Sequence, residues 1–113
     1  MFFWKKDDAS KPRPKRIGAK EAKEMIDAGG VVIVDARTPG EFSEKRIPGA
    51  INIPCGNIAG TRPKELPDLD ATILVYCLSG GRSALAVKHL AAMGYTKLYD
   101  FGGIMSWPYD TTC

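Results

Sequence analysis

A cysteine followed by a glycine-rich loop and an arginine is the part of this sequence best suited to chemistry. Cys77 ends an apolar run, and the residues after it are Leu78, Ser79, Gly80, Gly81, Arg82 and Ser83. Glycines allow a backbone to curl with positive φ, so that several N–H groups can point toward one atom. A helix that starts after such a loop adds unpaired N–H donors and the positive end of its dipole. We therefore expect the loop to lower the pKa of the Cys77 thiol and to hold a nucleophilic thiolate.

Three charged residues extend this candidate site. Arg82 offers a fixed cation, which either binds an anionic substrate or holds the start of the next helix to a carboxylate. Asp35 and Arg37 follow an earlier apolar run, and we expect them to form an ion pair or a hydrogen-bonded brace for the loop rather than to act in catalysis. A lone cysteine after a buried strand is more often a small core residue. The loop around Cys77 is what favours a catalytic role.

The elements that must position these residues alternate between helix and strand. Apolar residues at helical spacing after Gly18 predict a first helix, which ends at the glycine pair 29–30. The runs 31–34 and 72–76 are rich in β-branched residues and apolar almost throughout. Such runs suit strands that are buried on both faces of a parallel sheet. Thr38, Pro39 and Glu41 form the signature of a capped helix start.

Shorter elements complete the alternation. They are predicted as a brief strand at 50–53, a loop with one helical turn at 56–70, a helix at 82–93, a short strand at 97–99 and a final turn that opens at 102–103. This order predicts an α/β sandwich around a mostly parallel sheet. Ligands of such sheets bind beyond the carboxyl ends of the strands, which is where Cys77 falls.

Composition and charge limit the class of protein. The 113 residues, 44% hydrophobic and 26% charged, suit one compact domain. Three cysteines without CxxC or metal-ligand spacing argue against a disulfide framework and a metal site. Residues 1–20 carry seven basic and two acidic side chains, whereas the remainder carries nine basic and eleven acidic ones. The basic character therefore belongs to the N-terminal segment, and no nucleic-acid partner is expected.

The N-terminal segment bears on location. Residues 1–4 are apolar, but a bilayer span needs about 20 apolar residues. No membrane span is therefore expected in this chain. Free thiols favour the cytoplasm, although an exported or anchored parent sequence stays open.

Four motifs, in order along the chain, resemble those of the rhodanese family of sulfurtransferases in its single-domain form. The loop from Cys77 to Ser83 is similar to the active-site loop of that family. The other motifs are Val34-Asp35-Ala36-Arg37 with Glu41-Phe42, Ile47-Pro48-Gly49-Ala50 with Asn52-Ile53-Pro54, and Gly102-Gly103 with Trp107. The resemblance covers about residues 17–109. It implies a rhodanese-like three-layer sandwich whose mostly parallel central sheet has helices on both faces. We divide the chain into a basic tail or linker at 1–16 and a rhodanese domain at 17–113.

The resemblance implies sulfur transfer through Cys77. The thiolate takes the outer sulfur of thiosulfate or a related small anionic donor and releases sulfite. N–H groups of residues 78–83 stabilise the resulting persulfide, and a thiophilic acceptor then removes the sulfur. That acceptor is cyanide or a thiol, a protein thiol included. The family chemistry implies ping-pong kinetics with neither a metal nor an organic cofactor, and a monomer is expected.

Other positions depart from the family pattern or stay open. Arg46 stands where the family commonly has a histidine, a change that concerns packing or substrate steering rather than the nucleophile. Gly18 stands where a serine cap is usual. Cys55 is expected to be a bystander, although it follows the second predicted strand and can lie on the same rim as Cys77, which leaves a resolving role open. Cys113 is expected to be a bystander.

Other functions compete with sulfur transfer by a free-standing enzyme. Phosphatases and arsenate reductases of the same fold use a loop with five residues between cysteine and arginine, whereas four separate Cys77 from Arg82. A non-enzymatic rhodanese-like binding module usually lacks the cysteine, which this chain keeps. A persulfide relay to a protein partner would use Cys77 in the same way. Sulfur transfer is the hypothesis that these residues favour.

Overall fold

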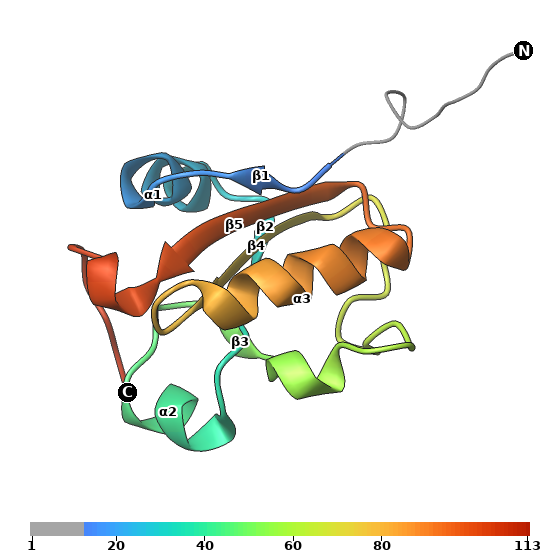
Figure 1. Cartoon of the computed structure of the whole chain (residues 1–113). Helices are drawn as coiled ribbons and strands as arrows, with labels where there is room; N and C mark the ends of the chain where they lie inside the picture. Colours follow the sequence, from blue (N-terminus) through green and yellow to red (C-terminus); the bar gives the residue numbers. More distant parts are fainter. Residues whose placement is uncertain (1–12) are drawn as a thin grey trace, which may run out of the picture.

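The computed structural model describes residues 13–113, which fold around one five-stranded sheet (Figure 1). The elements in chain order are β1 (Lys15–Arg16), α1 (Ala19–Ala28), β2 (Val31–Asp35), α2 (Pro39–Glu44), β3 (Ile51–Asn52), the 3-10 helix η2 (Cys55–Asn57), β4 (Thr72–Cys77), α3 (Gly81–Ala92), β5 (Lys97–Gly103) and the 3-10 helix η3 (Ile104–Ser106). The strands lie in the order β1-β5-β4-β2-β3, and all four neighbouring pairs are parallel.

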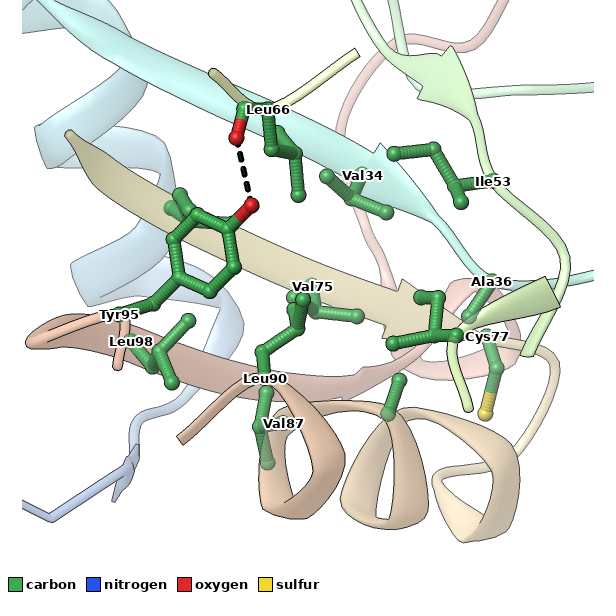
Figure 2. Packing of buried hydrophobic residues seen from close by; sticks show 13 residues of the cluster. Val34, Ala36, Ile53, Leu66, Val75, Cys77, Val87, Leu90, Tyr95 and Leu98 are labelled. Atoms are coloured by element: carbon green, nitrogen blue, oxygen red, sulfur yellow. Dashed lines mark hydrogen bonds between the residues drawn. The ribbon is translucent and has the colours of Figure 1, made fainter. Parts of the chain in front are cut away.

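The sheet is buried on both faces because apolar residues fill both sets of alternating positions in its central strands. On one face, Val75 of β4 packs in a cluster with Leu90 of α3 (Figure 2). On the other face, Leu74 packs in a second cluster with Ala22 of α1. The predicted three-layer α/β sandwich is confirmed. Within residues 13–113, no helix combines the length and apolar character needed to cross a membrane.

The sheet begins slightly earlier than the predicted start of the domain. Lys15 and Arg16 pair with Tyr99 and Asp100 of β5, and the N–H of Ile17 donates to the Asp100 carbonyl at 3.0 Å. The last two residues assigned to the linker therefore form an edge strand, because their backbone groups find partners on β5. Residues 1–12 of the predicted tail lie outside the described residues.

Strand β5 is longer than predicted. It was expected at 97–99 with a turn opening at 102–103, but it continues to Gly103, which pairs with Cys77. The register shifts between Val75 and Cys77, so two residue steps on β4 match three on β5. A Cβ atom on Gly103 would lie 2.1 Å from the Leu78 carbonyl oxygen. The glycine therefore serves a close backbone approach rather than a turn.

The predicted start of α2 is confirmed. The Thr38 hydroxyl accepts a hydrogen bond from the Glu41 N–H at 3.2 Å, and the Glu41 carboxylate accepts one from the Thr38 N–H at 3.0 Å. This capping box satisfies two backbone donors and fixes the direction of the Glu41 side chain.

Candidate active site

Cys77 lies at the carboxyl end of β4, where its sulfur faces the first turn of α3 (Figure 2). The residue is 1% exposed. The N–H of Gly80 donates to Sγ at 3.0 Å. Gly80 has a φ of 121°, a conformation that favours glycine and lets the chain turn back over the sulfur. The sulfur is thus buried, yet it faces the nitrogen atoms of its own loop.

Hydrogen bonding affects the pKa of the Cys77 thiol more strongly than burial does. Burial acts to raise the pKa of the Cys77 thiol, because a charge is costly away from water. Hydrogen bonds from the Ser83 side chain and from the N–H groups of Ser83, Gly80 and Arg82 act in the opposite direction. The net result is a pKa lowered from the ordinary 9.0, which is the direction that the loop sequence predicts.

Alkylation should report this difference between cysteines. Burial and the nearby Cys77 raise the pKa of Cys55, although Arg82 lowers it. We expect the pH midpoint for alkylation of Cys77 by iodoacetamide to lie below that of Cys55, since the thiolate is the reacting form. Peptide mass spectrometry over a pH series gives both midpoints, which do not depend on how fast each site reacts. A Cys77 midpoint equal to or above that of Cys55 would contradict the assignment.

The rest of the predicted loop divides into an exposed and a buried part. Leu78 and Ser79 are exposed, and the Leu78 carbonyl accepts a hydrogen bond from the Met105 N–H at 3.2 Å. Gly81 is the first residue of α3, so of the glycine pair only Gly80 takes positive φ. Among the described residues, the N–H groups that act on the sulfur are those of Gly80, Arg82 and Ser83.

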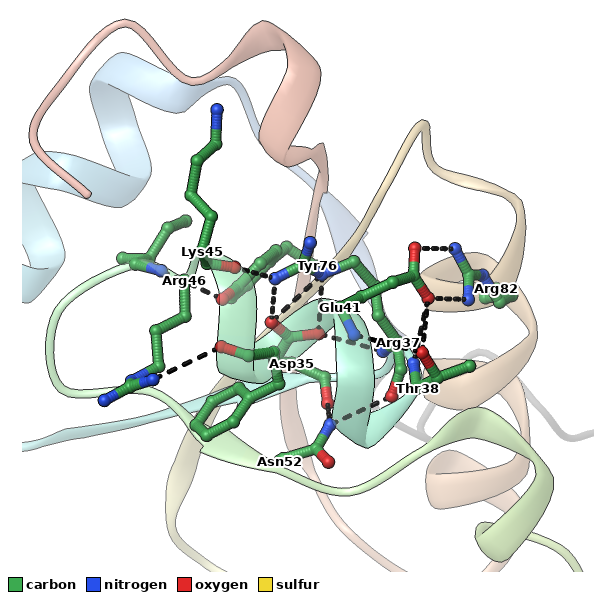
Figure 3. A network of polar contacts seen from close by, with 11 residues as sticks. Asp35, Arg37, Thr38, Glu41, Lys45, Arg46, Asn52, Tyr76 and Arg82 are labelled. Carbon is green, nitrogen blue, oxygen red and sulfur yellow. Dashed lines mark hydrogen bonds and ion pairs between the residues drawn. The ribbon is translucent and has the colours of Figure 1, made fainter. Parts of the chain in front are cut away.

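Arg82 forms a bidentate ion pair with Glu41 of α2 (Figure 3). The nitrogen–oxygen distances are 2.8 and 3.1 Å. Arg82 and the Thr38 N–H hold the pKa of the Glu41 carboxyl at about 2. This is the second of the two roles considered for Arg82, a link between the start of its helix and a carboxylate. Its side chain is still 38% exposed, and its role toward an anionic substrate stays a prediction.

The Glu41 pair should make a small, pH-dependent contribution to stability. A pKa below the unfolded value of 4.5 stabilises the fold above that pH, and the contribution is lost as the pH falls toward 2. We expect Glu41→Gln to lower the free energy of unfolding at pH 7 by about 0.5–1 kcal/mol, since the pair is partly exposed. Urea unfolding at pH 7 and at lower pH tests this. A difference between variant and wild type that does not shrink in acid would contradict it.

Asp35 and Arg37 form the predicted ion pair, and both are buried. The guanidinium donates to Asp35 at 2.6, 3.0 and 3.1 Å and also to the Lys45 carbonyl. The Asn52 amide donates to the carbonyls of Asp35 and Arg37 at 3.0 and 2.9 Å. The network therefore braces the segment that carries α2 (Figure 3). It reaches the cysteine loop through the Glu41–Arg82 pair.

Arg46 and Cys55 have structural surroundings of their own. Arg46 lies over the Phe42 ring at 4.8 Å and exchanges backbone hydrogen bonds with Thr112, so it packs α2 against the C-terminal segment. Cys55 is half-buried and packs against the cluster that contains Cys77, whereas Cys113 is exposed. That Cys55 is a bystander stays a prediction. Among residues 13–113, no group of three or more potential ligands could hold a metal ion.

Two residues of the site escape prediction from sequence. Glu41 was identified only as a capping residue, and its pairing with Arg82 joins positions 41 residues apart. Asp100 was missed because the predicted strand ended at residue 99. The available signal was a carboxylate directly before Phe101 in an apolar stretch. Asp100 is 1% exposed and accepts a hydrogen bond from Ser83 at 2.8 Å.

A pocket opens beside the cysteine loop. It is lined by Arg37, Glu41, Glu44, Lys45, Leu78, Ile104 and Met105. Met105 is 74% exposed and Leu78 is 38% exposed, so the rim next to the loop is apolar and accessible.

Comparison with known proteins assigns the fold and site to a family. The rhodanese-like domain family matches residues 18–109. A sulfurtransferase of Allochromatium vinosum is 36% identical over 84 residues, which cover 74% of this chain and 77% of that protein. The thiosulfate sulfurtransferase PspE of Escherichia coli is 35% identical over 71 residues, which cover 63% and 68%. A crystal structure of a rhodanese-related protein from Thermoplasma volcanium superposes with a TM-score of 0.73 at 31% identity, covering 87% of this chain and 97% of that one. The chain belongs to the rhodanese family and is a rhodanese-type sulfurtransferase.

Proposed function

We propose that this enzyme transfers a sulfane sulfur from thiosulfate, or a related small anion, to a thiophilic acceptor through a persulfide on Cys77. The observation that carries the proposal is the Gly80 N–H at 3.0 Å from Sγ, in a loop that lowers the pKa of the thiol. Relatives named thiosulfate sulfurtransferase support the choice of donor.

The first half-reaction is a displacement at sulfur. The Cys77 thiolate attacks the outer sulfur of thiosulfate, a new S–S bond forms, and the original S–S bond breaks with its electron pair leaving on sulfite. The persulfide that remains is anionic. N–H groups held in place before the reaction stabilise such a charge without reorganisation. The fixed Gly80 N–H is therefore of use both to the thiolate and to the intermediate.

The second half-reaction returns the enzyme. Cyanide or a thiolate attacks the outer sulfur, and Cys77 leaves as a thiolate. The acceptor in this scheme approaches past Leu78 and Met105, whose exposed apolar side chains suit a protein thiol better than they suit a small ion. A donor and an acceptor that use the same covalent intermediate give ping-pong kinetics.

Intact-mass spectrometry tests the proposal. Incubation with thiosulfate should add the mass of one sulfur atom to the wild type, and later addition of cyanide should remove it. Cys77→Ser should not gain the sulfur, whereas the matched variants Cys55→Ser and Cys113→Ser should gain it. Absence of the adduct with thiosulfate and with other sulfane donors would overturn the proposal. An adduct that persists in Cys77→Ser would overturn the assignment of the nucleophile.

A further inference from the structure

A buried carboxylate lies behind the nucleophile, with one hydroxyl between them. Ser83 of α3 is fully buried, and its Oγ is 3.6 Å from Cys77 Sγ and 2.8 Å from Asp100 Oδ1. Asp100 comes from β5, the strand beside β4, and it is 1% exposed. Sulfur, hydroxyl and carboxylate thus form a chain of three polar groups shielded from water.

The hydrogen atoms in this chain can be assigned. A serine hydroxyl has one hydrogen to donate. Asp100 Oδ1 is the nearest acceptor, at 2.8 Å, whereas the carbonyl oxygens of Gly80 and Gly102 lie at 3.1 and 3.4 Å. A hydrogen bond to a charged acceptor is also the stronger one. While Cys77 is a thiol, Ser83 therefore donates to Asp100, and the thiol donates to the free lone pair of Ser83.

The Asp100 carboxylate is held through its Oδ1 atom, which accepts hydrogen bonds from two donors. The Gly102 N–H donates to Asp100 Oδ1 at 2.9 Å. In the part of the chain that the structure describes, Oδ2 has no hydrogen-bond partner. The nearest cation, Arg16 of β1, is 4.0 Å from Oδ2, and its side chain is 73% exposed. Asp100 is thus fixed toward Ser83.

We propose that Asp100 is a positioning residue that accepts the thiol proton of Cys77 through Ser83. As the sulfur attacks its donor, the S–H bond breaks and its proton passes to Ser83 Oγ. The former Ser83 proton passes to Asp100 Oδ1 in the same step. A thiolate and a carboxylic acid replace a thiol and a carboxylate, so the total charge of Cys77, Ser83 and Asp100 is unchanged. The proton never has to reach water, from which the sulfur is shielded.

The proton returns at the end of the cycle. When the acceptor takes the outer sulfur, Cys77 leaves as a thiolate, and Asp100 sends the proton back through Ser83. Over the two half-reactions, the thiol proton therefore leaves Cys77 and returns to it without net exchange with solvent. It rests on the proposed persulfide chemistry of Cys77, and it serves the fraction of enzyme that carries a thiol when the donor binds.

Hydrogen-bond partners are available both for the thiol with an Asp100 carboxylate and for the thiolate with a protonated Asp100. In the thiolate state Ser83 turns its hydrogen toward Sγ, which would leave Asp100 Oδ1 without that donor. A proton on Asp100 supplies the missing hydrogen bond, since it can donate to Ser83 Oγ. Other charged or titratable groups near these three side chains are Arg16 on β1, Cys55 in η2, and Arg82 with its partner Glu41. All of them stay in the variants used below.

Single-turnover kinetics over a pH series test the relay. Asp100→Asn keeps the shape of the side chain but cannot take a proton, and Ser83→Ala removes the connecting hydroxyl. We expect both to slow persulfide formation by about 10²-fold at pH values below the thiol pKa, the range of general-base effects. The rate ratio to wild type should fall toward one at higher pH, where the thiolate is already formed. Asp27→Asn, on the surface of α1, is the matched control and should leave the profile unchanged.

Further measurements distinguish failure of the relay from misfolding of the variants and from failure of the proposed function. Wild type should react more slowly in D₂O at low pH, and both variants should lose this isotope effect. A rate loss that is uniform over pH, or a wild type without an isotope effect, would overturn the relay whether or not the variants fold. Alkylation of Cys77 by iodoacetamide is measured in parallel. If alkylation shows the pH signature but thiosulfate gives no persulfide, the relay stands and the proposed function fails. If persulfide forms without the signature in either reaction, only the relay fails.

Discussion

Arg37→Ala is expected to lower the free energy of unfolding by about 3–5 kcal/mol, the cost of removing one partner of a buried ion pair. The Asp35 carboxylate has no exposure to water, and the guanidinium of Arg37 supplies its side-chain partners at 2.6–3.1 Å. Removal of the cation leaves a buried negative charge and frees the Lys45 carbonyl. Since domains of this size are stable by about 5–15 kcal/mol, this loss removes a large fraction of the free energy of unfolding.

Urea unfolding of matched variants checks the cause. Asp35→Asn combined with Arg37→Ala should recover part of the loss, because the uncompensated charge is gone. Arg62→Ala, an exposed arginine in the loop before β4, should change the free energy by no more than about 0.5 kcal/mol. A loss below about 1 kcal/mol for Arg37→Ala would mean that the pair does not hold the α2 segment.

Gly103→Ala is expected to reduce sulfur transfer by about 10²-fold, the cost of displacing reacting groups by about 1 Å. The new methyl group would meet the Leu78 carbonyl oxygen at 2.1 Å and the Leu78 carbonyl carbon at 2.5 Å. Both contacts are with backbone, so relief requires movement of the loop that starts at Cys77. That loop carries Gly80, whose N–H must stay near Sγ.

Persulfide formation under single-turnover conditions measures this effect, with circular dichroism to confirm folding. Gly56→Ala is the control, because a Cβ there meets no atom within 4 Å and the residue has no positive φ. It should leave the rate unchanged. An unchanged rate in Gly103→Ala would show that the loop tolerates the displacement, and the close approach would then have no part in catalysis.

Much of the fold follows from patterns within single segments. The runs at 31–34 and 72–76 are apolar at every or nearly every position, and only strands covered on both faces bury such runs. The capping signature at Thr38 and Glu41 depends on residues three apart, so it is readable locally. The order of motifs also indicated the loop of Cys77, because a strand, two glycines and a helix start are contiguous in sequence.

What could not be predicted depends on contacts between distant segments. The sequence leaves two roles open for Arg82, anion binding or pairing with a carboxylate, and only the fold brings Glu41 of α2 to its guanidinium. Strand β5 continues to Gly103, whose close fit against the Leu78 backbone is invisible without the neighbouring strand. Asp100 lay beyond the predicted strand, and its importance arises from Ser83, on a helix that packs over the sheet.

The register shift between β4 and β5 lies beside the Asp100 carboxylate. In an even ladder each amide of an inner strand is consumed by the strand next to it. Here the β5 residues opposite the shift include Gly102, whose N–H binds the Asp100 carboxylate at 2.9 Å. A main-chain N–H at this irregular stretch of the strand therefore orients an acid in the protein interior. The irregular end of β5 thus helps to place Asp100 behind Ser83 and Cys77, in addition to pairing with β4.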